Sequence, residues 1–444
     1  MTDSQTHDLL IIGGGISGTA LLYLASRYSS LNRITLVEKY ASLAAVNSSA
    51  RNNSQTLHCG DIETNYTLEK ALVVQRAANM IRRYAEHVAD RERFFFQHPK
   101  MILAVGDDEV ARLRARFEQF APHYPALSWL DKNGIAAVEP HIVDDHGSPR
   151  KESLGACASQ DEFCAVDYGA LAHSFVQRAN QQDKQISVKL SCTVESIKST
   201  GETFEVVTNQ GVLTARAVVI SAGGHSLLFA QRMGYGLDFS VLPVAGSFYY
   251  TPRVLNGKVY TMQNDKLPFA AIHGDPDVLE HGKTRFGPTA LILPMLERYA
   301  PATIADFFRV AHIDRHVIKV LGSLFGDADI RRYIAKNVLF EIPIVRRRLF
   351  LKDAQKIVPS LRLEDLTFAK RTGGIRPQLI DKTKDQLLLG EAKIDTGKGI
   401  IFNMTPSPGA TSCLANGEKD LAAVTAFLGE TFDQEHFAAE LLTG

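Results

Sequence analysis

Residues 8–18 read Asp-Leu-Leu-Ile-Ile-Gly-Gly-Gly-Ile-Ser-Gly, an apolar run that leads into Gly-x-Gly-x-x-Gly and then into a helical pattern. A second apolar run, residues 34–37, ends in Glu38, twenty positions after the last glycine of the motif. A lone Gly-x-Gly-x-x-Gly is weak evidence. With a strand before it, a helix after it and an acid at this distance, it indicates a dinucleotide-binding βαβ unit.

Each residue of this motif has a physical task. Gly13 allows the tight turn, Gly15 lets a pyrophosphate approach the backbone, and Gly18 lets helix and strand pack closely. Backbone N–H groups at the helix start, near Ser17, face the phosphates. Glu38 can accept hydrogen bonds from ribose hydroxyls and would repel a 2′-phosphate. We therefore expect these five residues to form the core of the cofactor site.

Other features of the chain indicate which dinucleotide is bound. No second Gly-x-Gly-x-x-Gly follows a strand later on, so a separate nicotinamide site is not evident. The absence of Cys-x-x-Cys argues against a disulfide reductase. The motif also stands at the extreme N-terminus, as in many FAD-binding oxidases. These features favour a flavoprotein that oxidises its own small substrate over the alternative, a nicotinamide-dependent dehydrogenase.

The composition is that of a globular protein of two or three domains. Lys plus Arg equals Asp plus Glu, at 49 each in 444 residues, so net charge gives no reason to expect nucleic acid. We see no signal-peptide pattern, and every apolar run is shorter than the roughly 18 residues of a membrane-spanning helix. The five cysteines are scattered and odd in number, which favours reduced thiols in a cytoplasmic compartment, and no metal site is expected.

The order of patterns along the chain predicts an α/β protein with an inserted domain. Residues 187–216 read as a β-meander that feeds the apolar run 217–224, and a helix is expected to start near Thr67. Residues 242–295 read as strands and residues 301–337 mostly as helices. We expect a discontinuous Rossmann-like FAD-binding domain of residues 1–90, 150–240 and 357–444, and a substrate domain of mixed β-sheet and helices made of residues 91–149 and 241–356.

Two further segments are expected at the cofactor. Residues 47–58 carry too many hydrogen-bonding side chains for a buried element, and residues 405–412 form a helix start rich in small residues. The positive end of that helix would stabilise negative charge on a reduced flavin ring. Together with the end of the meander, these segments predict cofactor contacts from Ser49, Arg51, Asn53, Ser54, Gln55, Val194, Ala222, Gly223, Ser407, Gly409, Ala410 and Thr411.

Four short segments carry a resemblance to a known family. They are Asp-Ile-Glu-Thr-Asn-Tyr-Thr (61–67), Leu-Pro-Val-Ala-Gly-Ser-Phe (242–248), Leu-Pro-Phe through His-Gly-Asp (267–275) and Thr-Pro-Ser-Pro-Gly-Ala-Thr (405–411). They resemble the FAD-dependent malate:quinone oxidoreductases, within the D-amino-acid-oxidase-like flavoproteins and their glutathione-reductase-type FAD domain. The resemblance runs from the first strand to about Leu428, while residues 91–148 differ from the longer members.

The resemblance implies an activity and its partners. FAD would accept hydride from (S)-malate, giving oxaloacetate, and electrons would leave to a membrane quinone, ubiquinone or menaquinone. It also implies peripheral contact with a lipid surface, at the cytoplasmic face of the inner (plasma) membrane. Two alternatives stay open: a flavin-dependent dehydrogenase or oxidase of another 2-hydroxydicarboxylate such as L-2-hydroxyglutarate, and a flavin sensor without turnover.

Oxidation of a secondary alcohol also requires removal of the hydroxyl proton, for which a histidine is suited. His273 is our first candidate, because it follows a strand-like run in the substrate domain and matches a pocket histidine of related 2-hydroxyacid oxidases. His58 is the second candidate, as base or as a flavin neighbour, because it ends the polar segment 47–58.

A dicarboxylate also requires fixed positive charge, which arginine supplies in bidentate form at any working pH. Arg376 is the strongest candidate, because it follows two glycines, precedes a proline and matches a family position close to the flavin. Arg285 is a candidate for the second carboxylate, and Tyr249 and Gln263 are expected to line the pocket.

Three other features have weaker functional interpretations. Cys413 lies near the C-terminal helix start, but its context does not match the relatives that attach flavin to a cysteine. Residues 344–352 mix basic and apolar side chains and are our candidate for lipid contact, with a solvated basic turn as the alternative. Residues 94–96, three consecutive phenylalanines, are expected in the core.

A substitution at the middle glycine tests the cofactor assignment. Gly15→Val would place a side chain where the pyrophosphate must lie, so the purified protein is expected to be colourless. The measurement is the flavin absorbance of the purified variant beside that of the parent. A yellow, active Gly15→Val protein would contradict the proposed geometry.

Overall fold

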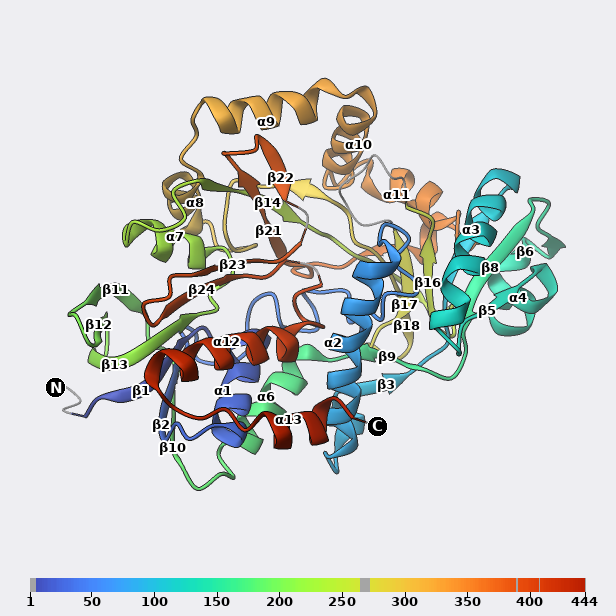
Figure 1. Cartoon of the computed structure of the whole chain (residues 1–444). Coiled ribbons are helices and arrows are strands. Elements are labelled where there is room, and N and C mark those ends of the chain that lie inside the picture. Colours follow the sequence, from blue (N-terminus) through green and yellow to red (C-terminus); the bar gives the residue numbers. More distant parts are fainter. Residues whose placement is uncertain (1–4, 264–271, 389, 407, 444) are drawn as a thin grey trace.

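The computed structural model describes residues 5–263, 272–388, 390–406 and 408–443. A mainly parallel sheet with its helices occupies the lower part of the molecule in Figure 1, and an antiparallel sheet lies to its right. A layer of helices crosses the top of the same view, above the strands labelled β14 and β21.

Five parallel strands form the centre of the first sheet, in the order β10 (Gln185–Lys189), β2 (Arg33–Val37), β1 (His7–Ile12), β13 (Gly211–Ile220) and β24 (Ile400–Met404). Ile12 lies beside both Val37 and Ile220 in the register, so three strands end at one edge. Since ligands of open α/β sheets bind at the carboxyl ends of their strands, this edge is where the glycine motif and Glu38 are expected to act.

The predicted β-meander is present but is one strand shorter than expected. β11 (Val194–Ser199), β12 (Phe204–Thr208) and β13 pair antiparallel in sequence order. Residues 188–190 were predicted as its first strand, which is wrong, because β10 pairs in parallel with β2 at the far edge. A short alternating run does not reveal which edge it joins. β23 (Ala392–Asp395) adds to β24 on the other side.

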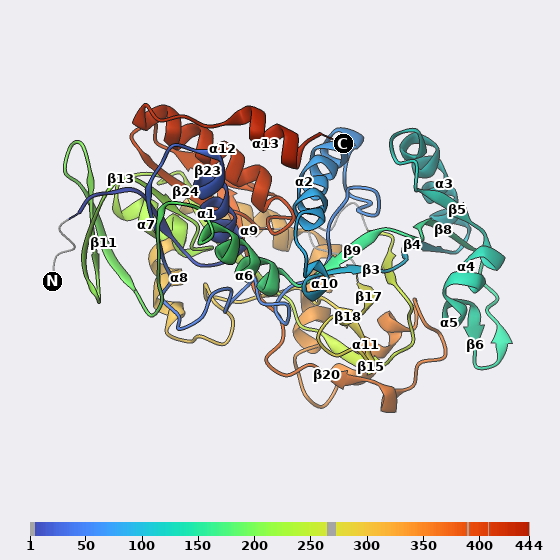
Figure 2. The ribbon, with the colours of Figure 1, turned by 90° about the horizontal axis from the view of Figure 1, so that it is seen from below.

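Helices cover both faces of the parallel sheet. On one face α1 (Ile16–Tyr28) packs between α6 (Tyr168–Ala179) and α12 (Cys413–Leu428), as Figure 2 shows from below. α2 (Leu68–Glu86) and α13 (Gln434–Leu441) extend this layer. α2 begins where predicted, because the Thr67 side chain accepts a hydrogen bond from the Lys70 N–H and caps it. On the other face α7 (His225–Arg232) and the meander close a second core.

The substrate side of the molecule contains two antiparallel sheets. The larger has the order β20 (Thr367–Phe368), β15 (Tyr249–Pro252), β18 (Lys283–Gly287), β17 (His273–Pro276), β16 (Lys258–Thr261), β4 (Lys100–Val105), β8 (Leu154–Ser159) and β5 (Ser128–Leu130), with β16 and β4 parallel. The smaller has the order β19 (Leu291–Ile292), β14 (Phe239–Ala245), β21 (Ile375–Asp381) and β22 (Gln386–Leu388).

The remaining elements complete the substrate side. The predicted helical region contains α8 (Thr303–Ala311), α9 (Arg315–Gly326) and α10 (Ala328–Leu339), followed by α11 (Arg346–Ala354). α3 (Asp107–Phe120), α4 (Lys132–Val138) and α5 (Pro140–Val143) flank β4, β5 and β8. Two small ribbons pair β3 (Phe95–Gln97) with β9 (Phe163–Val166), and β6 (Asp144–Asp145) with β7 (Ser148–Pro149). Phe94 and Phe95 are buried, as expected, and Phe96 is partly buried.

Strand pairing differs from the predicted domain boundaries in two places. β8 lies in the piece predicted for the FAD domain, yet it pairs with β4 of the substrate sheet. β20, β21 and β22 also lie in a predicted FAD piece, yet β20 pairs with β15, β21 pairs with β14, and β22 pairs with β21. Hydrophobic pattern identifies a strand but not its partner. The division by residue number therefore stays a prediction, and the pairing argues for moving these strands to the inserted domain.

An ion pair joins the last helix to the first and should make stability depend on pH. Glu440 of α13 accepts hydrogen bonds from Arg27 and, at 2.5 Å, from the Tyr28 hydroxyl of α1. The Arg27 hydrogen bond lowers the Glu440 pKa from 4.5 to about 2. A carboxyl whose pKa is lowered by folding stabilises the protein above its unfolded pKa and loses this effect as pH falls toward 2.

Glu440→Gln is therefore expected to lower the free energy of unfolding at pH 7 by about 1–2 kcal/mol, discounted for partial exposure of the pair. Thermal melts of both proteins at pH 7, 5 and 3 measure the effect. The difference in Tm should shrink between pH 5 and pH 3. A difference that is constant over this range would mean that the Glu440 charge is not responsible.

Candidate functional site

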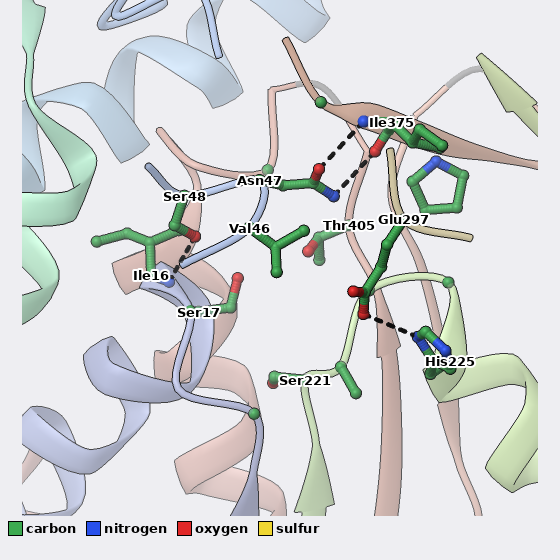
Figure 3. Close-up of a pocket in the computed structure, with 18 of the residues that line it drawn as sticks. Ile16, Ser17, Val46, Asn47, Ser48, Ser221, His225, Glu297, Ile375 and Thr405 are labelled. Carbon is green, nitrogen blue, oxygen red and sulfur yellow. Dashed lines mark hydrogen bonds and ion pairs between the residues drawn. The ribbon is translucent and has the colours of Figure 1, made fainter. Parts of the chain in front are cut away.

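A cavity of about 410 Å³ opens at the carboxyl edge of the parallel sheet. Gly13, Glu38 and Ser221 line it from the ends of β1, β2 and β13, while Phe248 and Arg376 line it from the substrate side. Figure 3 shows Ile16, Ser17 and Ser221 on one side of this space and Ile375 on another. The cavity therefore lies where the two parts of the molecule meet.

The three motif glycines face different surroundings. Gly13 has φ +113°, and a Cβ there would lie 2.4 Å from the Ser221 carbonyl oxygen. A Cβ on Gly18 would lie 2.0 Å from the Gly13 carbonyl oxygen. Around Gly15 the nearest atom to a Cβ would be the Ser48 hydroxyl, at 3.1 Å, so this glycine borders the cavity instead of packing on backbone. Its absent side chain leaves room for a ligand.

The start of α1 is suited to a phosphate. Gly15 is its N-cap residue and supplies no side-chain cap. The Ile16 N–H donates to Ser48 Oγ at 2.9 Å, and Ser17 also lines the cavity. Helix N-termini attract anions through their N–H groups and dipole. Ser48 was missed from the sequence, and its signal was its place inside the donor-rich segment 47–58.

Glu38 is held rigidly at the cavity wall. Its carboxylate accepts hydrogen bonds from the Gly14 N–H at 2.7 Å and from the Tyr40 N–H at 2.9 Å. A carboxylate oxygen can accept more than one hydrogen bond, so Glu38 retains capacity for a ribose hydroxyl. Glu38, twenty residues after Gly18, thus lies at the end of β2 and binds the backbone directly after β1.

A charged cluster lies at another part of the cavity and was not found from the sequence. Glu297 accepts hydrogen bonds from Lys39 and Tyr40, which follow β2, and its Oε1 is 3.6 Å from His225 Nδ1. Burial lowers the pKa of His225. Figure 3 shows the pair Glu297 and His225. The cluster ties the substrate side to the dinucleotide-binding edge.

The other predicted cofactor residues separate into two groups. Cavity-lining members are Asn53, Ser54, Val194, Ala222, Gly223, Gly409 and Ala410. Ser49, Arg51, Gln55 and Thr411 are not among the lining residues, and Ser407 lies outside the described residues. Gln55 is buried and donates to the Ala50 carbonyl at 3.0 Å, while Thr411 accepts from the His58 N–H at 3.1 Å. These two support the loops behind the cavity. Cys413 is buried and is also not among its lining residues.

Arg376 is a cation in the cavity wall. It lies on β21, and no ion pair to it occurs among residues 5–263, 272–388, 390–406 and 408–443. Its neighbours are Tyr333, Tyr260 and Tyr66, and burial lowers its pKa. A guanidinium removed from bulk water requires compensation by an anion or by hydrogen bonds. The site can therefore receive a negatively charged ligand.

Asn47 fixes the strand that carries Arg376. Its side-chain amide donates to the Ile375 carbonyl at 2.9 Å and accepts from the Ile375 N–H at 3.1 Å, as drawn in Figure 3. A Cβ on Gly374 would lie 2.6 Å from Asn47 Oδ1, so this contact requires glycine. The Gly-Gly before Arg376 thus allows close approach of the cofactor loop. Sequence reasoning did not identify Asn47, although it lies in segment 47–58.

His58 lines the same cavity as Arg376. Its Nδ1 lies 2.6 Å from Glu63 Oε1, and the Gly60 N–H donates to the other oxygen of Glu63 at 2.9 Å. Burial would raise the pKa of Glu63, but the hydrogen bond and charge of His58 hold that pKa below its usual value. A carboxylate that binds Nδ1–H orients the ring and leaves Nε2 as the proton acceptor.

His273 lies in a buried charge cluster and is not among the cavity-lining residues. Its Nδ1 is 2.8 Å from Asp275 Oδ1, and its ring stacks on Tyr260 with centroids 4.4 Å apart. Lys258 lies 3.5 Å from Asp275, and burial lowers the pKa of His273. The Tyr260 hydroxyl reaches Thr56, which lines the cavity, at 2.8 Å. His273 is thus connected to the cavity through two other residues.

The other predicted substrate residues also do not line the cavity. Arg285 is fully buried, donates to the Ala50 carbonyl at 3.2 Å and lies 3.5 Å from Asp277. The Tyr249 hydroxyl donates to the Phe340 carbonyl at 2.8 Å. The Gln263 N–H donates to Thr64, and its side-chain oxygen is buried without a hydrogen-bond partner in the described part of the chain. Of the predicted catalytic and substrate residues, the cavity brings together Arg376 and His58.

Comparison with known proteins identifies relatives of the whole chain. The model of the family described as FAD dependent oxidoreductase matches residues 8–419. A probable malate:quinone oxidoreductase of Campylobacter jejuni is 48% identical, covering 99% of both chains. A malate:quinone oxidoreductase of Helicobacter pylori is 45% identical, over 99% of this chain and 98% of the relative. The human mitochondrial L-2-hydroxyglutarate dehydrogenase is 25% identical, over 93% and 87%.

Solved structures of lower sequence identity share the fold. The FAD-bound L-α-glycerophosphate oxidase of Mycoplasma pneumoniae is 19% identical, with a TM-score of 0.64 over 96% of each chain. The glycine oxidase of Geobacillus kaustophilus is 17% identical, with a TM-score of 0.65 over 95% of each chain. The predicted fold, a Rossmann-like FAD-binding domain of the D-amino-acid-oxidase type with an inserted domain, is confirmed.

Proposed function

This chain belongs to the malate:quinone oxidoreductases of the FAD dependent oxidoreductase family, and on this basis we propose that it oxidises (S)-malate to oxaloacetate and passes the electrons to a membrane quinone. Its cofactor is FAD. The observation that carries the proposal from the site itself is Arg376, a cation in the cavity wall that has no acidic partner among the described residues.

The residues of the cavity fit FAD. The start of α1, where the N-cap residue Gly15 has no side chain, suits a pyrophosphate, while Glu38 suits a ribose. Gly409 and Ala410 border the same cavity before α12, where the helix N-terminus would favour negative charge. When bound, FAD supplies the acceptor for the hydride that leaves malate C2.

Arg376 would bind a malate carboxylate. Bidentate hydrogen bonds orient a planar carboxylate, and burial strengthens them relative to water. Burial lowers the pKa of Arg376, and the neighbouring Tyr333, Tyr260 and Tyr66 act in the opposite direction. We propose that tyrosine hydroxyls, uncharged at neutral pH, accompany this arginine because an acidic neighbour would compete with the substrate. Asn47 acts as a positioning residue for this strand.

His58 would take the proton from the malate hydroxyl. It lines the same cavity as Arg376, and Glu63 holds its Nδ1 at 2.6 Å, so Nε2 is the ring nitrogen that can act as base. His273 has an equivalent acidic partner, Asp275, but is not a cavity-lining residue. This difference supports the proposal that His58 is the base and that His273 supports Tyr260.

A quinone acceptor implies that the enzyme transfers electrons at a lipid surface. Quinones reside in membranes, and we infer peripheral contact with the cytoplasmic face. Within the described ranges, we find no helix with both the length and the apolar composition that crossing a bilayer requires. The choice between ubiquinone and menaquinone follows from the assay below.

Purified protein should transfer electrons from (S)-malate to a dye without added NAD. Parallel reactions with ubiquinone and menaquinone analogues identify the quinone. L-2-hydroxyglutarate is tested as the alternative substrate, because a more distant human relative is an L-2-hydroxyglutarate dehydrogenase. Anaerobic bleaching of the flavin by malate excludes a sensor without turnover. Greater kcat/KM for L-2-hydroxyglutarate than for malate would contradict the proposed substrate.

Replacement of Arg376 should damage substrate binding but not cofactor binding. Arg376→Ala removes the partner of a buried carboxylate, so kcat/KM for malate should fall by an amount equivalent to about 2–5 kcal/mol while the protein stays yellow. Arg376→Lys keeps the charge without the bidentate geometry and should give an intermediate loss. Steady-state kinetics and flavin absorbance measure both effects. Unchanged kcat and KM in Arg376→Ala would remove this residue from the site.

Matched substitutions distinguish the two histidines. His58→Asn should slow flavin reduction by malate about 10²–10⁴-fold, the usual contribution of a general base. His273→Asn should lower Tm, because it breaks a buried pair with Asp275, but should leave the rate of flavin reduction close to that of the parent. Anaerobic stopped-flow measurements of flavin reduction test both. The opposite pattern, with flavin reduction slowed in His273→Asn alone, would assign the base to His273.

A further inference from the structure

Exposed apolar side chains are concentrated on one part of the surface. Of the fifteen large hydrophobic side chains that are exposed in the described residues, eight lie between residues 308 and 344. Ile318 and Phe325 of α9 are 61% and 42% exposed, and Ile344 after α10 is 89% exposed. Single exposed apolar residues are ordinary, but such a cluster marks an interaction surface. We call the outer side of residues 303–344 the α8–α10 surface.

Core packing does not explain these residues. α9 already packs Val317 and Val320 into a core with Leu242 and Ile380 of the β14–β21 sheet. Ile318 and Phe325 are seven residues, or about two helical turns, apart and therefore share one face of α9. This face differs from the inward face that carries Val317 and Val320. α9 thus has an inward apolar face and a second apolar stripe in contact with solvent.

Charge at the C-terminal edge of this surface specifies the partner. Residues 303–344 contain six Lys and Arg against five Asp and Glu, and residues 345–352 add four basic residues and no acidic one, in a chain that is neutral overall. Arg315 lies one turn before Ile318, and Arg348 one turn after Ile344, both in exposed positions. Lys319 is paired with Asp385 at 2.6 Å, so it contributes less. Apolar side chains mixed with excess positive charge are typical of helices that lie on anionic lipid.

The surface is placed close to the substrate end of the cavity. Figure 1 shows α9 along the top of the molecule and α10 at its right end, on the side opposite α12 and α13. Asn337 of α10 accepts a hydrogen bond from the Ala290 N–H at 2.7 Å, and Ala290 and Arg376 line the same small pocket beside β14. A membrane under α9 and α10 would therefore bring lipid near the part of the cavity where malate is proposed to bind.

We propose that the α8–α10 surface docks the enzyme on an anionic bilayer and turns the Arg376 end of the cavity toward the quinone. The proposal rests on the proposed function, which identifies the electron acceptor as a membrane quinone. It also moves most of the apolar contact with lipid from the predicted segment 344–352 to α9 and α10, and leaves the exposed Arg348 and Lys352 of that segment for lipid headgroups. In that segment Phe350 is fully buried, the Arg346 guanidinium lies 3.9 Å from the centroid of the Phe368 ring, and Arg347 donates to the Leu363 carbonyl.

Vesicle binding by a double variant tests the surface. Ile318→Glu combined with Phe325→Glu adds two negative charges at exposed positions, where substitution should not disturb folding. Val73→Glu is the matched control, because Val73 of α2 is 63% exposed and lies outside the surface. Protein-free vesicles of phosphatidylcholine, with and without phosphatidylglycerol, are sedimented with each holoenzyme. The double variant should bind anionic vesicles roughly tenfold more weakly than the parent, while Val73→Glu binds as the parent.

Turnover provides the second readout. Malate oxidation with a quinone dissolved in the vesicles should fall with binding, while dye-linked oxidation in solution should match the parent. Equal vesicle binding by the double variant and the parent, or an equal loss in Val73→Glu, would overturn the proposal. Binding to native membranes but not to protein-free anionic vesicles would overturn it too, because the partner would then be a protein. Absence of dye-linked malate oxidation in the parent would instead contradict the proposed function and leave the binding result valid.

Discussion

The close contact between the end of β1 and the start of α1 is the constraint on which the rest of the site depends. A Cβ on Gly18 would come within 2.0 Å of the Gly13 carbonyl oxygen, so helix and strand approach at a distance that side chains forbid. This contact directs the N-terminus of α1 into the cavity and places Gly15 at its wall. The neighbouring strands β2 and β13 then bring Glu38 and Ser221 to the same edge.

A second set of contacts aligns the substrate side with that edge. Asn47 binds both backbone groups of Ile375, and the Arg51 carbonyl accepts a hydrogen bond from the Gly373 N–H at 3.0 Å. The cofactor loop and β21 are therefore held together directly before Arg376. Thr411 binds the backbone of His58 in the same way. The proposed substrate arginine and base thus come from distant segments that are joined through the cofactor loops.

Buried charge has two different arrangements in this protein. Away from the cavity, where an isolated charge would be costly, Asp275 and Asp277 pair with Lys258 and Arg285, and His273 binds Asp275. Arg376 has tyrosine neighbours and no acidic partner among the described residues, so its compensation is left to a ligand. Buried charges that pair with one another, as around Asp275, are typical of residues that support a structure. A cavity-lining cation without an acidic neighbour, such as Arg376 among the described residues, is typical of a site that binds an anion.

The sequence by itself determined the features that depend on local chemistry. The glycine spacing, the apolar strands at residues 9–12, 34–37 and 217–220, the start of α2 and the Gly-Gly-Ile-Arg-Pro segment could all be found there. Each is set by turn geometry, helix capping or hydrophobic period within a few residues. Family resemblance added the cofactor and the reaction, which spacing alone left open between flavin and nicotinamide.

Only the tertiary structure decided which edge β10 joins, which sheet contains β21, and which charged residues reach the cavity. His273 and Arg285 have the right chemistry for the site, but the partners that bury them are brought together by β17 and β18. Ser48, Asn47 and Glu297 act through contacts with residues between 32 and 328 positions away. Strand partners and burial depend on the whole chain, because each is set by packing against segments that are remote in sequence.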